Sequence, residues 1–187
     1  MKKNIPFLAV LLLLAGCTQY SLLEPKRMTI GEAFSVEPQI EWSRQSLGHN
    51  EIWTTDGPLL QQVRFVHGLT AGKTLYASAA ATVPETWPKL RNQTHPSEIM
   101  EFVVDSLTAL KANNPRTENL RPFNFGSHEG FRFDYNYNAD GLDHNGIAVG
   151  AEINGEFSLI LYSGTRLHYF EKHLDTFERI LGSIQPL

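Results

Sequence analysis

One stretch of this sequence comes close to the phosphate-binding loop of nucleotide-binding proteins. Residues 68–74 read Gly-Leu-Thr-Ala-Gly-Lys-Thr, with three residues between the glycines where the motif requires four. The motif also requires a following helix, whose N-terminal amides bind the phosphates. Residues 75–83 are too short and too strand-like for that helix. We therefore predict a turn between two strands here and no bound nucleotide.

A second stretch, residues 136–143, has the spacing of the first half of a calcium-binding loop. Asn136, Asn138 and Asp140 place side-chain oxygens at the first, third and fifth positions. The twelfth position requires a bidentate glutamate, and it is Ile147 here. Because only two aspartates would bring negative charge, we expect at most a weak metal site. Asn, Asp and Gly also form polar hairpin loops, which explains the same residues without a metal.

The histidines and serines lack the spacings that catalysis or transition-metal binding requires. None of the seven histidines has another four residues away, and the motif His-Glu-x-x-His is absent. Ser127, His128 and Glu129 are three catalytic residue types in a row, but neighbours on a strand point apart. Catalytic triads are instead assembled from distant positions. We therefore predict that the chain is not an enzyme and needs no cofactor.

The N-terminus has the pattern of an export signal that ends in a cysteine. Two lysines precede an apolar run over residues 5–14, shorter than the roughly 20 residues that span a bilayer. Residues 14–17 then read Leu-Ala-Gly-Cys, which resembles the lipobox of bacterial lipoproteins. The resemblance implies removal of residues 1–16 and a diacylglycerol thioether on Cys17, the only cysteine. The alternative is an ordinary signal peptide with an incidental cysteine.

Thr18 and the charge balance indicate where the mature chain resides and which partners it avoids. In Gram-negative lipoproteins an aspartate after the lipidated cysteine usually causes retention in the inner membrane. Thr18 therefore implies the periplasmic face of the outer membrane, with the N-terminal lipid as the membrane contact. Removal of residues 1–16 would leave 14 basic and 20 acidic side chains, a formal charge of −6. This charge argues against a nucleic-acid partner.

Two amphipathic helices are expected to frame the domain. The first spans residues 96–113 and starts with a proline, which suits the first helical position. Its apolar stripe consists of Ile99, Phe102, Val103, Leu107 and Leu110. The second spans residues 166–181, with Thr165 as its N-cap. Its apolar stripe consists of Leu167, Phe170, Leu174, Phe177 and Leu181.

Strand-like patterns fill much of the remaining sequence, around a loop over residues 48–58. They cover residues 28–43, 59–69, 74–81, 131–138, 147–153 and 157–162. The Asn-Gly pair at residues 154–155 is the strongest short signal for a two-residue hairpin turn. Such a turn sets Ile153 opposite Glu156, so large apolar residues fall on both faces of the hairpin. Either a bulge shifts this register or both faces are covered, and we expect cover by the two helices.

Together these elements predict an α+β domain over residues 28–187, after a lipidated tether over residues 17–27. We expect an antiparallel sheet of six or seven strands with two main helices packed on it. This order, and the ending Phe-Glu-Arg-Ile-Leu-Gly-Ser-Ile at residues 177–184, resembles the PsbP-like fold. That fold occurs in extrinsic photosystem subunits and in small bacterial envelope lipoproteins of the DcrB type. The resemblance implies a scaffold that mostly binds or assists other proteins.

The tryptophans are the candidate contacts for a partner. Trp42 lies near strand-like sequence and is expected in the core. Trp53 and Trp87 lie among turn residues, where a tryptophan either anchors a protein partner or covers the edge of a core. Our leading hypothesis is a non-catalytic envelope lipoprotein that binds or helps assemble another envelope protein. The alternatives are a small-ligand or weak calcium-binding module that uses residues 136–143, and an enzyme with an unrecognised site.

Overall fold

The computed structural model describes residues 20–76, 84–92 and 94–187. The export signal, Cys17 and Thr18 lie outside these residues, as does most of the strand expected over residues 74–81. Lipidation and the location of the chain therefore stay predictions. No helix in the described residues is long and apolar enough to cross a membrane.

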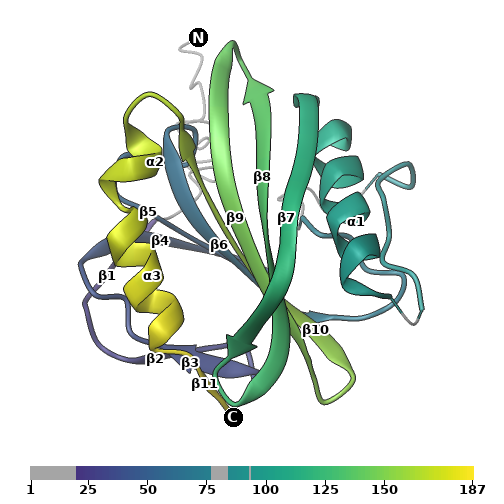
Figure 1. Ribbon diagram of the computed structural model, residues 1–187. Coiled ribbons are helices and arrows are strands. Elements are labelled where there is room, and N and C mark those ends of the chain that lie inside the picture. The colour runs from purple at the N-terminus through teal and green to yellow at the C-terminus, as the bar shows by residue number, and fades with distance from the viewer. Residues whose placement is uncertain (1–19, 77–83, 93) are drawn as a thin grey trace, which may run out of the picture.

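The strands of the described chain form two antiparallel sheets (Figure 1). The larger sheet has eight strands in the order β1-β4-β5-β6-β10-β9-β8-β7. These strands are β1 (Ser21–Leu23), β4 (Trp42–Leu47), β5 (Asn50–Thr54), β6 (Gln61–Leu69), β7 (Asn113–Phe125), β8 (His128–Ala139), β9 (Leu142–Ile153) and β10 (Glu156–Thr165). The smaller sheet has the order β11-β3-β2, and its strands are β2 (Met28–Ile30), β3 (Phe34–Val36) and β11 (Gln185–Pro186).

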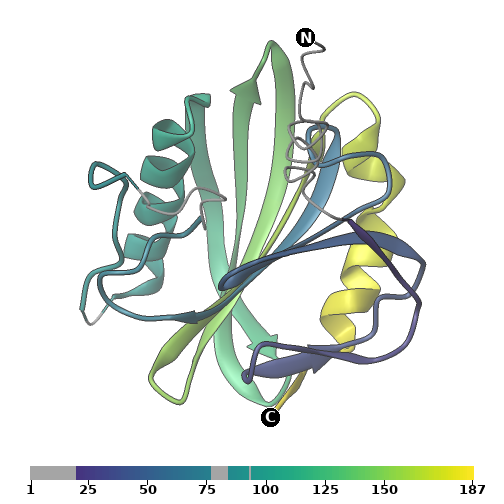
Figure 2. The same cartoon turned by 180° about the vertical axis from the view of Figure 1, so that it is seen from behind.

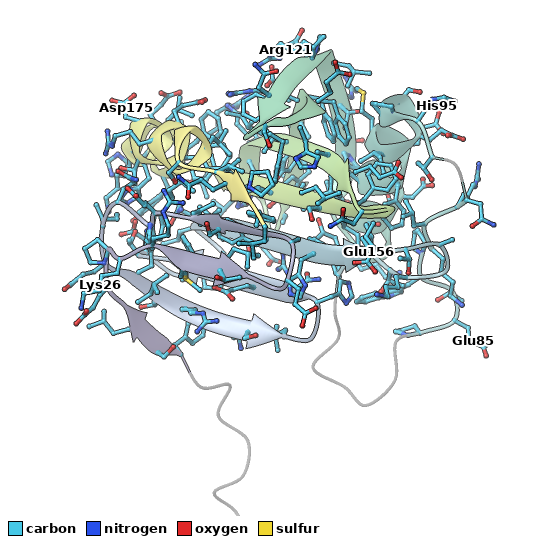
Figure 3. All side chains as sticks on the ribbon, turned by 90° about the horizontal axis from the view of Figure 1, so that it is seen from below. Lys26, Glu85, His95, Arg121, Glu156 and Asp175 are labelled. Atoms are coloured by element: carbon cyan, nitrogen blue, oxygen red, sulfur yellow. The ribbon has the colours of Figure 1, made fainter. Side chains whose placement is uncertain are left out.

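The helices of the described residues lie on opposite sides of the larger sheet (Figure 1, Figure 2). One side carries α1 (Pro96–Ala109), and the other carries α2 (Tyr169–Lys172) and α3 (Leu174–Gly182). Each face of the sheet therefore has its own apolar core. Charged side chains such as Lys26, Arg121 and Asp175 lie at the periphery in Figure 3.

The predicted fold class, an α+β domain with a six- or seven-stranded sheet and two main helices, is wrong. The described chain is mostly β, with a sheet of eight strands and a second sheet of three. Two segments were not predicted as strands over most of their length. They are the β4–β5 hairpin and β7, and both belong to the larger sheet. β7 is an edge strand with two register shifts and two prolines, so it shows no regular alternation of buried residues. β1, which pairs with β4, falls within the predicted tether.

The second predicted helix is also wrong as a continuous element. Thr165, the expected N-cap, ends β10, and α2 has only four residues. His173, between α2 and α3, has a φ of −121°, which is outside the helical region. The Tyr162 hydroxyl donates to the carbonyl of Phe170 at 2.6 Å and occupies the acceptor that a continuous helix would use.

The first predicted helix is confirmed as α1, with an earlier end. Glu98 accepts a hydrogen bond from the backbone N–H of His95 at 2.8 Å, which caps the first turn next to Pro96. The helix ends at Ala109 rather than at residue 113. Lys111 has a φ of 67°, which no helix continues through.

The predicted hairpin is confirmed in turn and register. Ile153 lies opposite Glu156, and the two turn residues have φ values of 54° and 81°. Alternate residues of β9 and β10 enter the two cores, with Val149 and Ile160 in one and Ala148 in the other. The expectation that both faces of this hairpin are covered is therefore confirmed, without a bulge at the turn.

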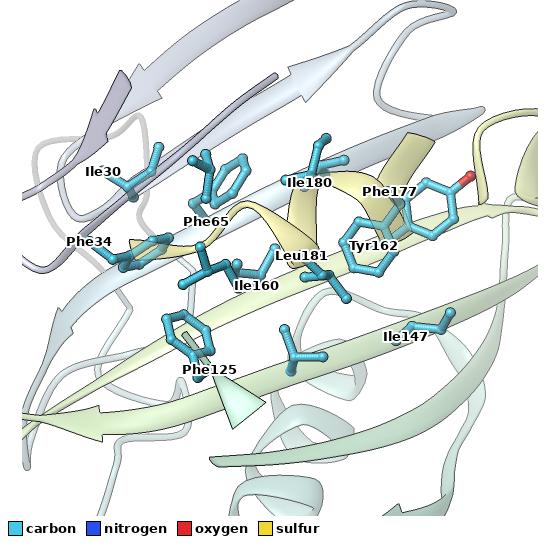
Figure 4. Packing of buried hydrophobic residues seen from close by; sticks show 14 of the residues in the cluster. Ile30, Phe34, Phe65, Phe125, Ile147, Ile160, Tyr162, Phe177, Ile180 and Leu181 are labelled. Carbon is cyan, nitrogen blue, oxygen red and sulfur yellow. The ribbon is translucent and has the colours of Figure 1, made fainter. Parts of the chain in front are cut away.

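The first core fills the space between the larger sheet, α3 and the smaller sheet (Figure 4). Phe177 of α3 stacks on Tyr162 of β10, Ile180 of the same helix belongs to this core, and all three side chains are fully buried. Trp42 is buried in the same core, as predicted, and its Nε1 donates to the carbonyl of Pro38 at 2.8 Å. The second core lies under α1 and leads into the pocket described next.

Candidate ligand-binding pocket

A pocket of about 320 Å³ lies between the C-terminal half of α1 and the larger sheet. Residues of β6, β8, β9 and β10 form its floor, and Leu107, Leu110 and Ala112 form the wall on the α1 side. The volume is at the lower end of the range found for small-ligand sites. Most of the lining is aliphatic or aromatic, with a few polar groups. This composition is typical of a small-molecule site.

Arg64 is the one lysine or arginine among the residues that line the pocket. It lies in β6 between Ile52 of β5 and Leu161 of β10, so two neighbouring strands fix its backbone. The guanidinium donates from Nη1 to Asn50 Oδ1 at 2.9 Å and from Nη2 to Gln62 Oε1 at 3.3 Å. Burial lowers the pKa of Arg64 from its ordinary value, because a buried site disfavours the charged form.

No carboxylate of the chain compensates the charge of Arg64. Every ion pair within 4.0 Å among the described residues involves another base. The residues outside the described part contain no Asp or Glu, so they cannot supply one. The guanidinium carbon instead lies 4.9 Å from the centre of the Tyr76 ring, a cation–π contact. Two neutral amides and an aromatic ring thus hold a cation that has no counter-ion.

Tyrosine rings cover the floor beside Arg64. Tyr135 and Tyr137 point to the same face of β8, and their ring centres are 6.2 Å apart. Tyr137 also stacks on His144 of β9 at 4.7 Å. A Cβ at Gly146 would overlap the Tyr135 ring, so glycine allows this ring to cover the neighbouring strand. Burial raises the pKa of both phenols, which keeps these two tyrosines uncharged beside Arg64.

Three exposed leucines border the mouth of the pocket. Leu59, Leu110 and Leu142 are 71%, 46% and 44% exposed, respectively. Burying such a side chain is worth about 1.5–3 kcal/mol, so an apolar group at the mouth would be stabilised. Asp140 is the one carboxylate that lines the pocket, and it is exposed at the turn between β8 and β9. The pocket is therefore apolar at its mouth and cationic at its floor.

The weak candidates for a calcium site lie along a hairpin and do not surround a common point. Asn136 and Asn138 belong to β8, and Asp140 starts the two-residue turn to β9. An extended strand does not wrap its oxygens around one cation as a calcium loop does. Within the described residues no group of three His, Cys, Asp or Glu side chains could hold a metal ion. The same hairpin borders the pocket through Tyr137 and Asp140. Its position is therefore compatible with the alternative hypothesis of a small-ligand module that uses residues 136–143.

The two tryptophans predicted as partner contacts have different positions. Trp53 lies within β5 and is fully buried, and its Nε1 donates to Glu51 Oε1 at 2.6 Å. It belongs to the first core and offers no surface to a partner. Trp87 precedes α1, is half-buried and packs against the second core. Its role as a partner contact stays a prediction.

Residues 68–74 comprise the end of β6 and the turn after it, without the features of a phosphate-binding loop. Gly68 and Gly72 have φ values of 61° and 85°, and the Lys73 ammonium donates to the carbonyl of Gly68. The next helix in the described residues is α1, which begins only at Pro96. Within the part of the chain that the structure describes, no helix N-terminus directly follows the glycines to bind a phosphate.

A polar cluster at the start of the β5–β6 loop brings a threonine, an aspartate and a histidine together without triad geometry. His173 Nε2 lies 2.9 Å from Thr55 Oγ1 and 3.4 Å from Asp56 Oδ2. In a catalytic triad the acid contacts the other ring nitrogen, so this acid does not orient a base. Lys172 pairs with the same carboxylate at 2.7 Å. The cluster thus attaches the α2–α3 junction to the sheet.

The free energy of unfolding is expected to fall as the pH is lowered from about 7.5 to about 5.5. Burial lowers the pKa of His173 and of His67 from the ordinary 6.5, so the unfolded chain binds more protons in this range. The stability is fully present above the ordinary pKa and is lost as the pH falls through it. Thermal unfolding at both pH values checks this, and His173→Gln should reduce the drop. An undiminished drop in that variant would assign the effect to other groups.

Sequence reasoning missed Arg64 and the pocket. The segment was identified as a strand from its apolar residues, and a single arginine within it suggests a position facing water. The available signal is that Phe65 and Val66 are consecutive apolar residues, and they enter the two different cores, which is typical of a strand covered on both faces. An arginine in such a strand is partly buried, but the sequence does not show that α1 leaves a pocket above it.

The fold is similar to solved structures, although no family model and no curated protein sequence matches the chain. The solution structure of cyanobacterial PsbP (CyanoP) from Synechocystis superposes with a TM-score of 0.54 at 8% identity. The match covers 92% of this chain and 95% of that chain. The crystal structure of LpqN, involved in cell envelope biogenesis of Mycobacterium tuberculosis, superposes with a TM-score of 0.39 at 9% identity. This match covers 92% of this chain and 87% of that chain. The first likeness confirms a PsbP-like fold, and the second is too distant to add to it.

Proposed function

We propose that this chain is a non-catalytic protein of the bacterial cell envelope whose domain binds a small apolar ligand. The pocket under α1 carries the proposal, because a volume of about 320 Å³ and an apolar lining suit a small molecule. It favours the small-ligand alternative over the hypothesis that the domain mainly assembles another protein. Residues 136–143 contribute to this site as a border of the pocket and not as metal ligands.

The proposed location rests on the N-terminal sequence. The lipobox-like residues 14–17 imply a lipid on Cys17, and Thr18 favours the periplasmic face of the outer membrane. The first strand starts at Ser21, four residues after Cys17. Four residues span at most about 14 Å, so the lipid would hold the domain next to the membrane surface.

Binding is proposed instead of catalysis because the pocket does not pair a nucleophile with a base. Among the described residues, Ser163 is the one serine, threonine or cysteine that lines it. The two ring nitrogens of His144 each lie 3.0 Å from a backbone carbonyl, those of Leu142 and Leu59. This histidine is therefore engaged with the backbone and is not positioned to activate Ser163.

Octanol, a neutral apolar probe, is expected to raise the melting temperature of the full chain purified in detergent. At about ten times its dissociation constant the shift should be about 3–5 °C, because ligand binding to the folded state stabilises it. Ala112→Trp should remove the shift by filling the pocket, since Ala112 lines its wall. Thr108→Trp adds the same side chain at an exposed position of α1 and should keep the shift. Equal shifts in both variants would contradict a binding pocket at this place.

Attachment of an envelope protein is the second candidate function. It is favoured by Leu167, which is 95% exposed in the turn between β10 and α2. An isolated exposed leucine is common on protein surfaces, so this observation supports the second candidate less than the pocket supports the first. Cross-linking of the full chain in membranes, with Leu167→Ser as the variant, compares the two. Loss of a stoichiometric partner in this variant would favour the second candidate.

A further inference from the structure

The uncompensated charge of Arg64 is not explained by a structural role. A guanidinium has five N–H groups, and within the described residues two of them donate, both to neutral amide oxygens. Keeping a charge at a partly buried position without a counter-ion costs free energy. A neutral residue could form the same two hydrogen bonds at a lower cost. The arrangement therefore suits a charge that acquires its partner from outside the chain.

A bound anion with a single charge would supply the missing partner. The planar guanidinium fits a carboxylate through two parallel hydrogen bonds. Because no second lysine or arginine of the described residues lines the pocket, only one negative charge is compensated there. Asp140 at the rim would repel a further negative charge at the mouth. The anionic group therefore belongs at the floor and an uncharged group at the mouth.

Three of the last four carbonyl groups of α1, those of Ser106, Leu107 and Thr108, accept hydrogen bonds from the backbone beyond the helix. Carbonyl groups at a helix C-terminus carry partial negative charge when they lack partners. Here the N–H of Lys111 donates to Thr108 at 2.9 Å, and that of Ala112 donates to Leu107 at 3.0 Å. The last turn is thus capped by the backbone that follows it.

The rest of the lining determines the apolar part of the ligand. Tyr135, Tyr137 and His144 stack on one another, so their faces are already partly covered. The remaining apolar lining is mostly aliphatic and extends from the floor to the exposed mouth. It consists of Leu59, Leu107, Leu110, Leu142 and Leu161. A flexible alkyl chain fits these side chains better than a further aromatic ring does.

We propose that the pocket binds an amphipathic monocarboxylate, with its carboxylate on the Arg64 guanidinium and its alkyl chain between Leu110 and Leu142. This inference rests on the proposed function and names the chemical class of the ligand. Asn50 is the positioning residue, because it is fully buried and accepts from Arg64 through Oδ1. Its Nδ2 donates to the carbonyl of Leu75 at 3.1 Å, which fixes the orientation of the amide.

Octanoate and octanol have alkyl chains of the same length, and only octanoate is charged. Comparing their affinities therefore separates the contribution of the ligand's charge from that of its apolar chain. Affinities for the full chain in detergent are measured by saturation-transfer NMR. A hydrogen bond to a charged group contributes enough to change affinity by about tenfold or more. Arg64→Gln should therefore lower the octanoate-to-octanol preference at least about tenfold. Arg121→Gln makes the same charge change on β7, away from the pocket, and should preserve the preference.

The outcomes distinguish this inference from the proposed function. If both probes bind with the same preference to the wild type and to Arg64→Gln, the proposal that Arg64 binds a carboxylate is wrong. The proposal of an apolar binding pocket would still stand. Failure of both probes to bind the wild type would overturn the proposed function as well.

The melting temperature without ligand gives a second readout for the same variant. A glutamine at this position would keep an N–H donor for Asn50 and remove the uncompensated charge, so Arg64→Gln should not lower the melting temperature. A strongly lowered melting temperature that Arg64→Lys restores would show a structural cation and contradict the proposal.

Discussion

Replacing Cys17 with serine is expected to abolish lipid attachment and to release the protein from the membrane. The lipid of a bacterial lipoprotein is joined through a thioether, and a serine hydroxyl does not form that bond. Stable anchoring takes at least two acyl chains, so a chain without them should bind membranes only marginally. Metabolic labelling with a fatty acid, followed by membrane fractionation, measures both effects. The expected product is an unlabelled chain that is either uncleaved or soluble.

Thr18→Ser is the matched control for this experiment. It keeps the cysteine and a hydroxyl residue after it, so labelling and membrane location should not change. Entry of label into Cys17→Ser would refute the lipobox prediction. A fully membrane-bound, cleaved but unlabelled variant would show that another part of the chain holds it there.

The elements that the sequence predicted well are those determined by short-range chemistry. The Asn-Gly turn at residues 154–155 requires positive φ at both positions, and asparagine and glycine adopt it readily. α1 combines a proline at its start with an apolar stripe, and four of the five stripe residues are buried. The fifth, Leu110, lies beyond the helix end and borders the mouth of the pocket.

The elements that the sequence misassigned depend on contacts between distant segments. The apolar stripe of residues 166–181 continues through His173, yet the Tyr162 hydroxyl and the Asp56 cluster interrupt the helix there. β7 is a strand because it pairs with β8, although its own residues are mostly exposed. Its local pattern therefore contains little of the signal that burial on one face gives to a strand.

The residues of the candidate site also depend on contacts between segments that are distant in the sequence. Trp53 lies near turn residues in the sequence, but pairing of β5 with β4 and β6 places it in the core. Asn136, Asn138 and Asp140 have the spacing of calcium ligands, but the hairpin places the two asparagines along β8 and the aspartate in the turn that follows. Arg64 becomes significant only because α1, distant in sequence, leaves space above it. The spacing of residues along the chain thus selected candidate residues, but it did not predict which other residues surround them in the fold.

Phe177→Ala is expected to cause the largest loss of stability among single substitutions in α3. The ring is fully buried, and it stacks on Tyr162 at 4.7 Å between ring centres. Truncating a buried phenylalanine costs about 3–5 kcal/mol, from lost transfer free energy and from the cavity. Typical domains have about 5–15 kcal/mol in total, so this change removes a large share. Thermal unfolding of the full chain should show a melting temperature lower by about 6–20 °C.

Two further substitutions on the same segment make the result a test of packing and not of helix propensity. Leu174, in the same predicted stripe, is half-buried against the first core, so Leu174→Ala should cost less than Phe177→Ala. Glu171 is exposed on α2, and Glu171→Ala should change the free energy of unfolding by no more than about 0.5 kcal/mol. Because alanine favours helices in all three positions, only burial predicts this order. Equal effects of the three variants would show that α3 does not pack on the sheet as described, and the PsbP-like arrangement of this face would be lost with it.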